Sequence, residues 1–417
     1  MKNSKKFIVL LLTIFLSILA VANYLFYLKL TETKNLSLKI VPEVNNSIEE
    51  LIIFHSKNLH DAYYLKPKPS TDKNTEIFIQ NIRKYNVLRN FTYLWNLSNS
   101  WISNQYIVSH KHEEIGNIFR ALKFAPIIKA DLDGRGSQLK FLLTLQGNQE
   151  VIFKPKWYEK ERILKGPVYG GKDRHTSEII AFYLSVILNL PFVPYCVERK
   201  ISVRKNILPV ASKRFLETTY TIENKTCVYG KCFYCFKKDA ICTDQYDTLT
   251  GAVIFNIKNK LKLSKSPWMR TYKIGKLAEW EQNESYCKIV QKSVSKKHLL
   301  DMVDTAIFDF FIQNGDRHHY EIMDGKILLI DNGKGLGNPY EHHIDILAPL
   351  YQCCVLRKKT WRRLLTLNND KISKYLRVMP DVTDFLSEEH LQAIDKRLLL
   401  IFGTIEYCVN KKKMLFI

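Results

Sequence analysis

The sequence predicts an α+β fold of two lobes, a smaller lobe rich in strands followed by a mainly helical larger lobe. Residues 138–154 indicate a β-hairpin, because two apolar runs flank the turn from Gln146 to Gln149. A helical pattern with an early glutamate, Glu178, follows this hairpin. Farther on, the apolar helical run Leu299 to Ile312 leads through a polar loop into the hydrophobic strand Ile327 to Ile330.

The loop and the strand that follow the long helical run carry two acids, Asp316 and Asp331. An acid on a loop and an acid just past a buried strand can converge on a metal-bound phosphate. Protein kinases use this layout, with one aspartate that takes a hydroxyl proton and a second, roughly 15–20 residues on, that holds metal ions. The alternative is a helix followed by an ordinary turn with solvated acids.

The predicted hairpin supplies a candidate phosphate-binding lysine. Lys154 ends an apolar strand, where an ammonium is costly to bury unless an anion meets it. The alternative is an edge-strand lysine that reaches solvent. Glu178 follows in the first turn of a helix that Thr176 or Ser177 is expected to cap. A first-turn glutamate usually complements the helix dipole, but strand lysine followed by helix glutamate is the order of kinase small lobes.

The remaining elements complete a two-lobed kinase order. Helical apolar spacing between residues 77 and 129 predicts packing helices, and two more strands are expected at Val197 to Val203 and Leu208 to Phe215. The apolar stretch Ala252 to Phe255 could link the lobes. Standard kinase signatures are missing, however: there is no H-R-D, D-F-G or A-P-E, and Gly134-Arg-Gly136 is the nearest match to the glycine-rich loop.

The amino terminus predicts a membrane anchor. Phe7 to Leu28 carries no charge and is long enough to cross a bilayer as a helix. Lysines precede it, which places the amino terminus in the cytosol and the remainder in the lumen. A cleaved signal peptide is the alternative, with small residues from Ala20 to Ala22 at its cleavage site, but the apolar run continues past them. We expect an anchor over 1–28, a stem over 29–89 and a catalytic domain over 90–417, whose lobes meet near residue 253.

Charge, cysteines and sequons agree with a luminal body. The net charge of +22 among 417 residues implies an acidic partner, and a luminal position disfavours nucleic acid. The spacing of four of the nine cysteines would also suit zinc, but disulfides are favoured in an oxidising lumen. Six N-x-S/T sequons are candidates for glycosylation: Asn35, Asn45, Asn90, Asn96, Asn224 and Asn283.

Four strings resemble the atypical secretory-pathway kinase family, which includes the Golgi casein kinase and the glycosaminoglycan xylosylkinase. They begin at Phe153 (F-K-P-K), Asp173 (D-R-H-T-S-E-I-I-A-F), Thr226 (T-C-V-Y-G-K-C-F-Y-C) and Gly315 (G-D-R-H-H-Y-E). The string I-L-A-P-L-Y-Q-C-C from Ile346 looks closest to the xylosylkinase branch. The resemblance covers roughly residues 90 to 410.

The resemblance implies a role for each matching residue. Asp316 would be the catalytic base. Glu178 and Asp331 would hold the metal, Mn²⁺ or alternatively Mg²⁺. The residues expected to contact ATP through their side chains are Gln138, Lys154, Glu321 and Asp331. The linker expected to contact the adenine consists of Ile254, Phe255, Asn256 and Ile257. His318 and His319 are expected to pack the loop or face the substrate, since phosphate chemistry prefers oxygen ligands.

The resemblance also implies four disulfides: Cys227–Cys242, Cys232–Cys235, Cys287–Cys353 and Cys354–Cys408. Cys196 would then remain a free thiol. The implied activity is phosphorylation of the xylose 2-hydroxyl in the glycosaminoglycan–protein linkage region, by a Golgi type II membrane protein. A secreted-pathway Ser/Thr kinase acting on acidic proteins is the alternative, and a non-enzymatic scaffold is the third hypothesis. Pairing with a second copy or a family member is left open.

Overall fold

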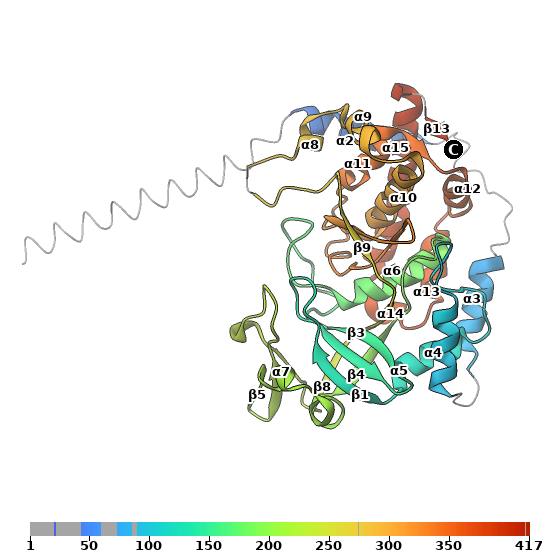
Figure 1. Cartoon of the computed structure of the whole chain (residues 1–417). Coiled ribbons are helices and arrows are strands. Elements are labelled where there is room, and N and C mark those ends of the chain that lie inside the picture. Colours follow the sequence, from blue (N-terminus) through green and yellow to red (C-terminus); the bar gives the residue numbers. More distant parts are fainter. Residues whose placement is uncertain (1–20, 22–42, 60–72, 86–89, 274, 413) are drawn as a thin grey trace, which may run out of the picture.

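The computed structural model describes residues 43–59, 73–85, 90–273, 275–412 and 414–417, together with Val21. Figure 1 shows a lower lobe built on a sheet and an upper lobe built mainly of helices. The sheet is antiparallel with the order β1-β2-β3-β8-β4. Its strands are β1 Ile127–Leu132, β2 Phe141–Leu145, β3 Gln149–Pro155, β4 Cys196–Ser202 and β8 Thr248–Phe255. The predicted α+β, two-lobed fold is confirmed.

The predicted hairpin is β2 and β3. Its register places Phe141 opposite Phe153, and their rings stack with centroids 5.6 Å apart. Gly147 and Asn148 both have positive φ, 88° and 68°, as a tight turn between twisted strands requires. A side chain at Gly147 would also clash, because a Cβ there would lie 2.7 Å from the Trp95 ring.

Two predictions for the small lobe are wrong in detail. Leu208 to Phe215 is not a strand: it forms a 3-10 turn, Leu208–Val210, and the short helix α7, Lys213–Leu216. Pro209 has no N–H to give to a sheet, and Ser212 caps α7 by accepting a hydrogen bond from the Phe215 amide. Ala252 to Phe255 lies within β8, so the link between the lobes begins only after Phe255.

The cysteine-rich segment forms a small three-stranded sheet of β5 Thr219–Ile222, β6 Lys225–Val228 and β7 Ile241–Cys242. Two disulfides, Cys227–Cys242 and Cys232–Cys235, hold it together. Cys287–Cys353 and Cys354–Cys408 are in the large lobe, and Cys196 is buried and free. All four implied pairs and the free thiol are therefore confirmed.

The large lobe is organised around the buried helix α10, Lys296–Ile312, which confirms the predicted apolar run. A sheet of β9 Lys262–Lys265, β10 His319–Met323 and β11 Lys326–Leu328 lies beside it. Around them are α8 Glu279–Gln282, α9 Tyr286–Ser293, α11 Ala348–Cys353, α12 Lys358–Thr366, α13 Lys371–Arg377, α14 Val382–Phe385 and α15 Glu388–Lys412. Strands β12 Val355–Leu356 and β13 Leu415–Phe416 pair in parallel.

In the described part of the chain, the helices α2 Glu43–Lys57, α3 Lys73–Arg83, α4 Phe91–Ser100 and α5 Ile115–Phe124 come before the sheet. α2 packs along α15, and α3 packs on α5 and on α6, His175–Ile187. Ile52 and Phe78 are fully buried at these contacts. The prediction of a stem over 29–89 is wrong for these two segments, because their apolar residues belong to the core.

The predicted anchor, residues 7–28, lies outside the described residues except for Val21. Within the described part of the chain, none of the helices has the length and apolarity that crossing a bilayer requires. Among the sequons, Asn90, Asn96 and Asn224 are exposed, whereas Asn283 is half-buried. The side chains of Asn35 and Asn45 are outside the described set, so glycosylation stays a prediction.

Candidate active site

A cavity of about 720 Å³ lies between the lobes. The structure brings every predicted site residue to its wall, although they come from strands, helices and loops spread over nearly 200 positions. They are Gln138, Lys154, Glu178, Ile254, Phe255, Asn256, Ile257, Asp316, Glu321 and Asp331. His318 and His319 also line it.

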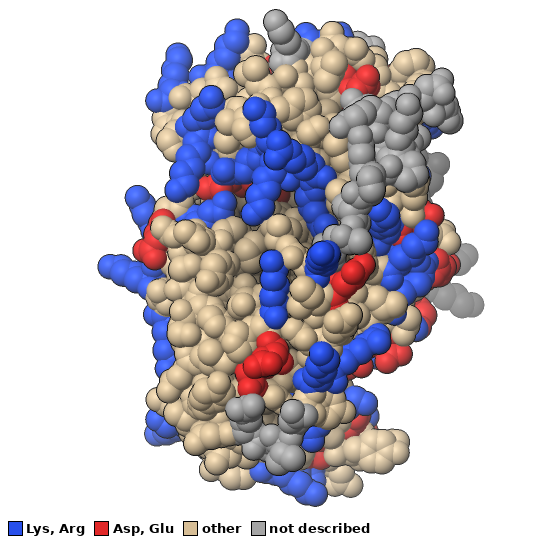
Figure 2. Space-filling view, turned by 90° about the vertical axis from the view of Figure 1, so that its right-hand side faces the viewer, with Lys and Arg blue, Asp and Glu red and all other residues tan. Residues whose placement is uncertain are grey.

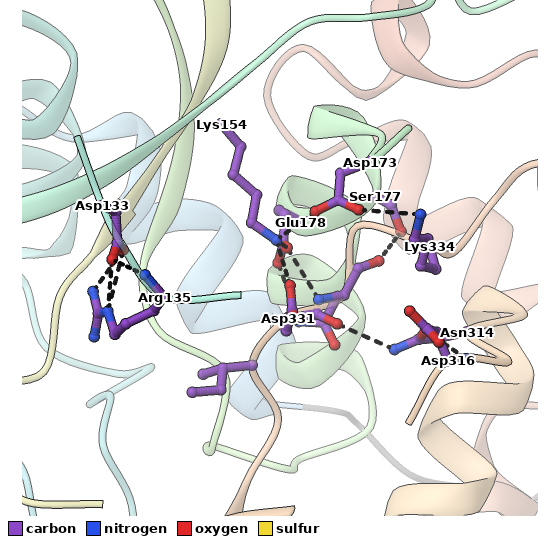
Figure 3. Close-up of polar contacts among 12 residues, drawn as sticks. Asp133, Arg135, Lys154, Asp173, Ser177, Glu178, Asn314, Asp316, Asp331 and Lys334 are labelled. Atoms are coloured by element: carbon purple, nitrogen blue, oxygen red, sulfur yellow. Dashed lines mark hydrogen bonds and ion pairs between the residues drawn. The ribbon is translucent and has the colours of Figure 1, made fainter. Parts of the chain in front are cut away.

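Lys154 is the charged centre of this cavity. It extends from β3, opposite Ala252 of β8, and its side chain is only 5% exposed. Its Nζ lies 2.6 Å from Glu178 Oε1, 2.6 Å from Asp331 Oδ1 and 3.1 Å from Asp173 Oδ2 (Figure 3). Burial alone would lower the pKa of Lys154, but the three carboxylates outweigh it and raise that pKa well above its ordinary value. The ammonium is therefore permanently charged.

Glu178 lies on helix α6, His175–Ile187, and its carboxylate contacts residues of both lobes. Its Oε1 also accepts a hydrogen bond from the Asn332 amide at 3.0 Å, and Ser177 Oγ donates to the Asn332 carbonyl at 2.7 Å. Glu178 is in the first turn as predicted, but neither Thr176 nor Ser177 caps the helix. The helix begins earlier, after Arg174, whose backbone amide donates to the Gly333 carbonyl at 2.7 Å.

Asp331 follows β11 and turns its carboxylate into the cavity, where the side chain is 55% exposed. Its φ of 59° lies in the left-handed region, which is uncommon for residues other than glycine but is adopted by aspartate more often than by most. Lys154 is the main cause of a pKa for Asp331 that lies well below the ordinary value. This carboxylate is ionised and partly open, as a ligand for a cation requires.

Asp316 lies on the loop after α10, on the large-lobe side of Lys154 (Figure 3). The helix ends at Gln313, which has a left-handed φ of 57°, and Asn314 Oδ1 then accepts a hydrogen bond from the Asp316 amide at 3.3 Å. The Asp316 carboxylate accepts a hydrogen bond from Tyr272 Oη at 2.5 Å. Burial raises the pKa of Asp316, which brings it toward the range of a general base.

Glu321 and Gln138, which both line the cavity, each have one side-chain oxygen without a hydrogen-bond partner among the described residues. The side-chain atoms concerned, Glu321 Oε2 and Gln138 Oε1, are buried. Glu321 lies on strand β10, within the segment before Ile327 that was predicted to be a polar loop, so that part of the prediction is wrong. Buried acceptors without donors are costly, so this wall suits a ligand that supplies donors or a cation.

Sequence reasoning gave no role to four residues that support the site: Asp173, Tyr272, Arg317 and Asn332. Arg317 donates to both oxygens of Asp309, at 2.9 and 2.7 Å, and to Asn332 Oδ1 at 2.9 Å. It therefore ties the Asp316 loop to α10 and to the segment after Asp331. Asp173 and Arg317 stand inside the strings quoted for the resemblance, which was the available signal. Tyr272 had none, because its segment is irregular.

The donor set fits a divalent cation. Glu178 and Asp331 direct oxygens at the same nitrogen, and carboxylate oxygens are the ligands that Mn²⁺ and Mg²⁺ prefer. Three carboxylates around one ammonium also leave an excess of negative charge, which a divalent ion would offset. Over the residues that the structure describes, no three His, Cys, Asp or Glu side chains already surround a single point as metal ligands do. Lys154 occupies the position between the two acids instead.

A family model described as "Golgi casein kinase, C-terminal, Fam20" matches residues 93–415. The chain belongs to the Fam20 family. Over 84% of its length and 86% of the relative, it is 38% identical to the glycosaminoglycan xylosylkinase homolog of Drosophila melanogaster. It is 40% identical to the Homo sapiens glycosaminoglycan xylosylkinase, over 76% of this chain and 80% of the relative. The Homo sapiens extracellular serine/threonine protein kinase FAM20C is 32% identical, with 56% of its length covered.

Two solved structures share the fold of this chain. A hydra Fam20 with sugar has a TM-score of 0.73 and 36% identity, covering 80% of this chain and 99% of that one. The Golgi casein kinase with Mn/ADP bound has a TM-score of 0.73 at 24% identity, covering 87% and 92%, and shares the fold. Together with the intact cavity residues, these relationships make this Fam20 protein a phosphotransferase.

Proposed function

We propose that this protein transfers the γ-phosphate of ATP to the 2-hydroxyl of xylose in the glycosaminoglycan–protein linkage region, using Mn²⁺ or Mg²⁺. The observation that carries the proposal is the meeting of Lys154, Glu178 and Asp331 at one point, in a cavity that Asp316 also lines. Identity of 38–40% with xylosylkinases over most of the chain supports the sugar acceptor.

The proposed chemistry divides the cavity by role. Lys154 and a cation held by Glu178 and Asp331 would offset the charge of the nucleotide phosphates. Asp316 accepts the proton of the acceptor hydroxyl while that oxygen attacks the γ-phosphorus. The bond from the γ-phosphorus to the bridging oxygen breaks, and ADP leaves with that electron pair. Positioning and charge neutralisation supply most of the rate, since phosphoryl transfer needs little covalent help.

Aromatic and ionic side chains surround Asp316 on its large-lobe side. A narrow cleft of about 40 Å³ opens beside it, lined by aromatic and ionic side chains that include Trp268, Tyr272 and Trp280. Arg270 and Asp345, which form an ion pair, add polar groups to the same wall. This cleft is too small to hold a sugar ring, so the choice of acceptor rests on the identity with the xylosylkinases.

We also propose a Golgi location with residues 1–28 as a type II anchor and residues 43–417 in the lumen. Four disulfides support an oxidising compartment. Figure 2 shows Lys and Arg side chains gathered on the helical half of one face. The exposed basic residues at the starts of α10 and α12 are Lys296, Lys297, Lys358, Lys359 and Arg362. This charge favours the nascent anionic glycan as partner.

A transfer assay tests the acceptor. The protein is incubated with γ-labelled ATP and Mn²⁺, offered a xylose-containing linkage oligosaccharide in one reaction and casein in another. We expect label in the sugar, and loss of that label when the acceptor is the 2-deoxyxylose analogue. Label in casein with none in the oligosaccharide would support the Ser/Thr kinase alternative and overturn the proposal.

A further inference from the structure

The hydroxyl of Tyr272 is hydrogen-bonded to the carboxylate of Asp316, the group that phosphate transfer is expected to use as its base. Tyr272 Oη donates to Asp316 Oδ1 at 2.5 Å. An acceptor hydroxyl that gives its proton to Asp316 would make the same kind of hydrogen bond, with an O–H group directed at a carboxylate oxygen. The phenol therefore already makes, within the protein, the contact that the acceptor is expected to make.

Core packing does not explain this contact. Tyr272 is 46% exposed, and its ring packs edge-on against Tyr169, with centroids 4.9 Å apart. The neighbouring His318 ring is farther away, at 6.4 Å. Among the residues described, Tyr272 joins no buried cluster, so its hydroxyl can leave Asp316 without opening the core. Burial and the Asp316 carboxylate both raise the pKa of the Tyr272 phenol, which keeps it a proton donor at neutral pH.

The cavity also gives water a route to Asp316, whose side chain is 24% exposed. Water competes with the sugar hydroxyl for the same base. In that side reaction, Asp316 would take a proton from water, the water oxygen would attack the γ-phosphorus, and the bond to the bridging oxygen would break. ADP and inorganic phosphate would be released, and ATP would be consumed without transfer.

We propose that the Tyr272 hydroxyl holds the place of the acceptor hydroxyl on Asp316, excludes water from that oxygen, and yields it when the acceptor enters. Tyr272 is thus a positioning residue that couples ATP cleavage to the presence of acceptor. The inference rests on the proposed function, because it takes Asp316 as the base for transfer. It concerns hydrolysis without acceptor, so its test does not depend on which acceptor is correct.

The test measures phosphate release from ATP and Mn²⁺ with no acceptor present, in the wild-type protein and in Tyr272→Phe. The variant keeps the ring contact with Tyr169 and removes only the hydroxyl. We expect hydrolysis to rise about tenfold, the value of one hydrogen bond to a charged group. We also expect a lower KM for the sugar acceptor in this variant, because the acceptor hydroxyl no longer has to displace the Tyr272 hydroxyl from Asp316. Hydrolysis in Tyr272→Phe should return to background when Asp316→Asn is added.

Tyr169→Phe is the matched control, since it removes the hydroxyl of the ring that packs on Tyr272 and that makes no contact with Asp316. Hydrolysis should be unchanged in this control, and the affinity for ADP should be equal in the wild-type protein, in Tyr272→Phe and in Tyr169→Phe. Unchanged or slower hydrolysis in Tyr272→Phe overturns the inference, as does incorporation of phosphate into Tyr272 itself. A wild-type protein that fails to phosphorylate xylose overturns the proposed function instead.

Discussion

At the scale of single residues, the site depends on one buried ammonium. Lys154 meets three carboxylates, and two of them, Glu178 and Asp331, come from different lobes. A buried charge without partners would cost several kcal/mol, so each partner keeps the others in place. The arrangement leaves Asp331 ionised and partly open toward the cavity. It is therefore both a structural contact between the lobes and a binding site for a charged ligand.

Replacing the proposed base should affect turnover more than binding. Asp316→Ala is expected to lower kcat by on the order of a hundredfold or more, because the acceptor hydroxyl loses the group that takes its proton. The affinity for nucleotide should change little, since Lys154 and Asp331 remain. Steady-state kinetics with the oligosaccharide acceptor would check this. Wild-type kinetics in the folded variant would remove Asp316 from this role.

The pH profile should report the same group. Burial raises the pKa of Asp316 above the ordinary aspartate value of 3.8, while the Tyr272 hydrogen bond partly opposes that rise. The carboxylate is the active form, so kcat/KM should fall as pH drops, with a midpoint above 3.8. Tyr272→Phe removes a donor that stabilises the carboxylate, which should move the midpoint to higher pH. A midpoint that shifts downward in this variant would contradict the assignment.

The sequence was sufficient to predict the site residues that follow the kinase order of strands and helices, and those that lie inside the strings resembling the kinase family. Lys154, Glu178, Asp316 and Asp331 could be predicted because each lies in, or just after, a recognisable strand or helix. The Tyr272 contact could not, since it joins positions 44 residues apart through an irregular segment. The left-handed φ of Asp331 was equally invisible, because its surroundings come from other elements: Lys154 of β3 donates to its carboxylate, and the amide of the next residue, Asn332, donates to Glu178 of α6.

At the scale of elements, periodicity located the long buried helix but misplaced several ends. α6 starts before its supposed caps: the Ser177 amide already bonds to the Arg174 carbonyl within the first turn, while the Ser177 hydroxyl donates to the Asn332 carbonyl of the large lobe. The stem prediction failed for α2 for a related reason. A short helix with mixed polarity is hard to predict from its own sequence, because its apolar residues are explained only by the surface that they cover. For α2 that surface is the face of α15.

The contact between α2 and α15 can be tested at Gly403. A Cβ at this position would lie 2.5 Å from the Ile52 carbonyl oxygen and 2.8 Å from the Ser56 amide nitrogen. Gly403→Ala should therefore push α2 away and lower the free energy of unfolding by about 1–3 kcal/mol, despite the better helix propensity of alanine. Denaturant unfolding measures this change in the free energy of unfolding. Leu399→Ala, at a 37% exposed position of the same helix, should stay within about 0.5 kcal/mol. A more stable Gly403→Ala protein would show that α2 does not pack there.

At the scale of the whole molecule, covalent links and buried polar contacts hold the large lobe around α10. Arg397 of α15 is fully buried and donates to the Phe311 carbonyl, at the end of α10, at 2.7 Å. Cys353, the last residue of α11, and Cys354, which follows it, form disulfides with two different helices: Cys353 with Cys287 of α9, and Cys354 with Cys408 of α15. The loop that carries Asp316 begins where these elements meet, so the rigidity of this lobe fixes the base.

The Cys354–Cys408 disulfide should contribute strongly to stability because it closes a loop with a sequence separation of 54. Changing both cysteines to alanine is expected to lower the free energy of unfolding by about 2–4 kcal/mol. The same change at Cys232–Cys235, which are three residues apart, serves as the control and should cost less. Equal losses in the two double variants, measured by denaturant unfolding, would contradict the expectation.

Metal-dependent nucleotide binding tests the central claim, that side chains from both lobes build one site for ATP and a divalent ion. Calorimetric titration of ATP with and without Mn²⁺ would be carried out on the wild-type protein and on Asp331→Ala. We predict that Mn²⁺ strengthens ATP binding to the wild-type protein and that Asp331→Ala abolishes this metal-dependent binding. Full, Mn²⁺-dependent affinity in the folded variant would contradict the account.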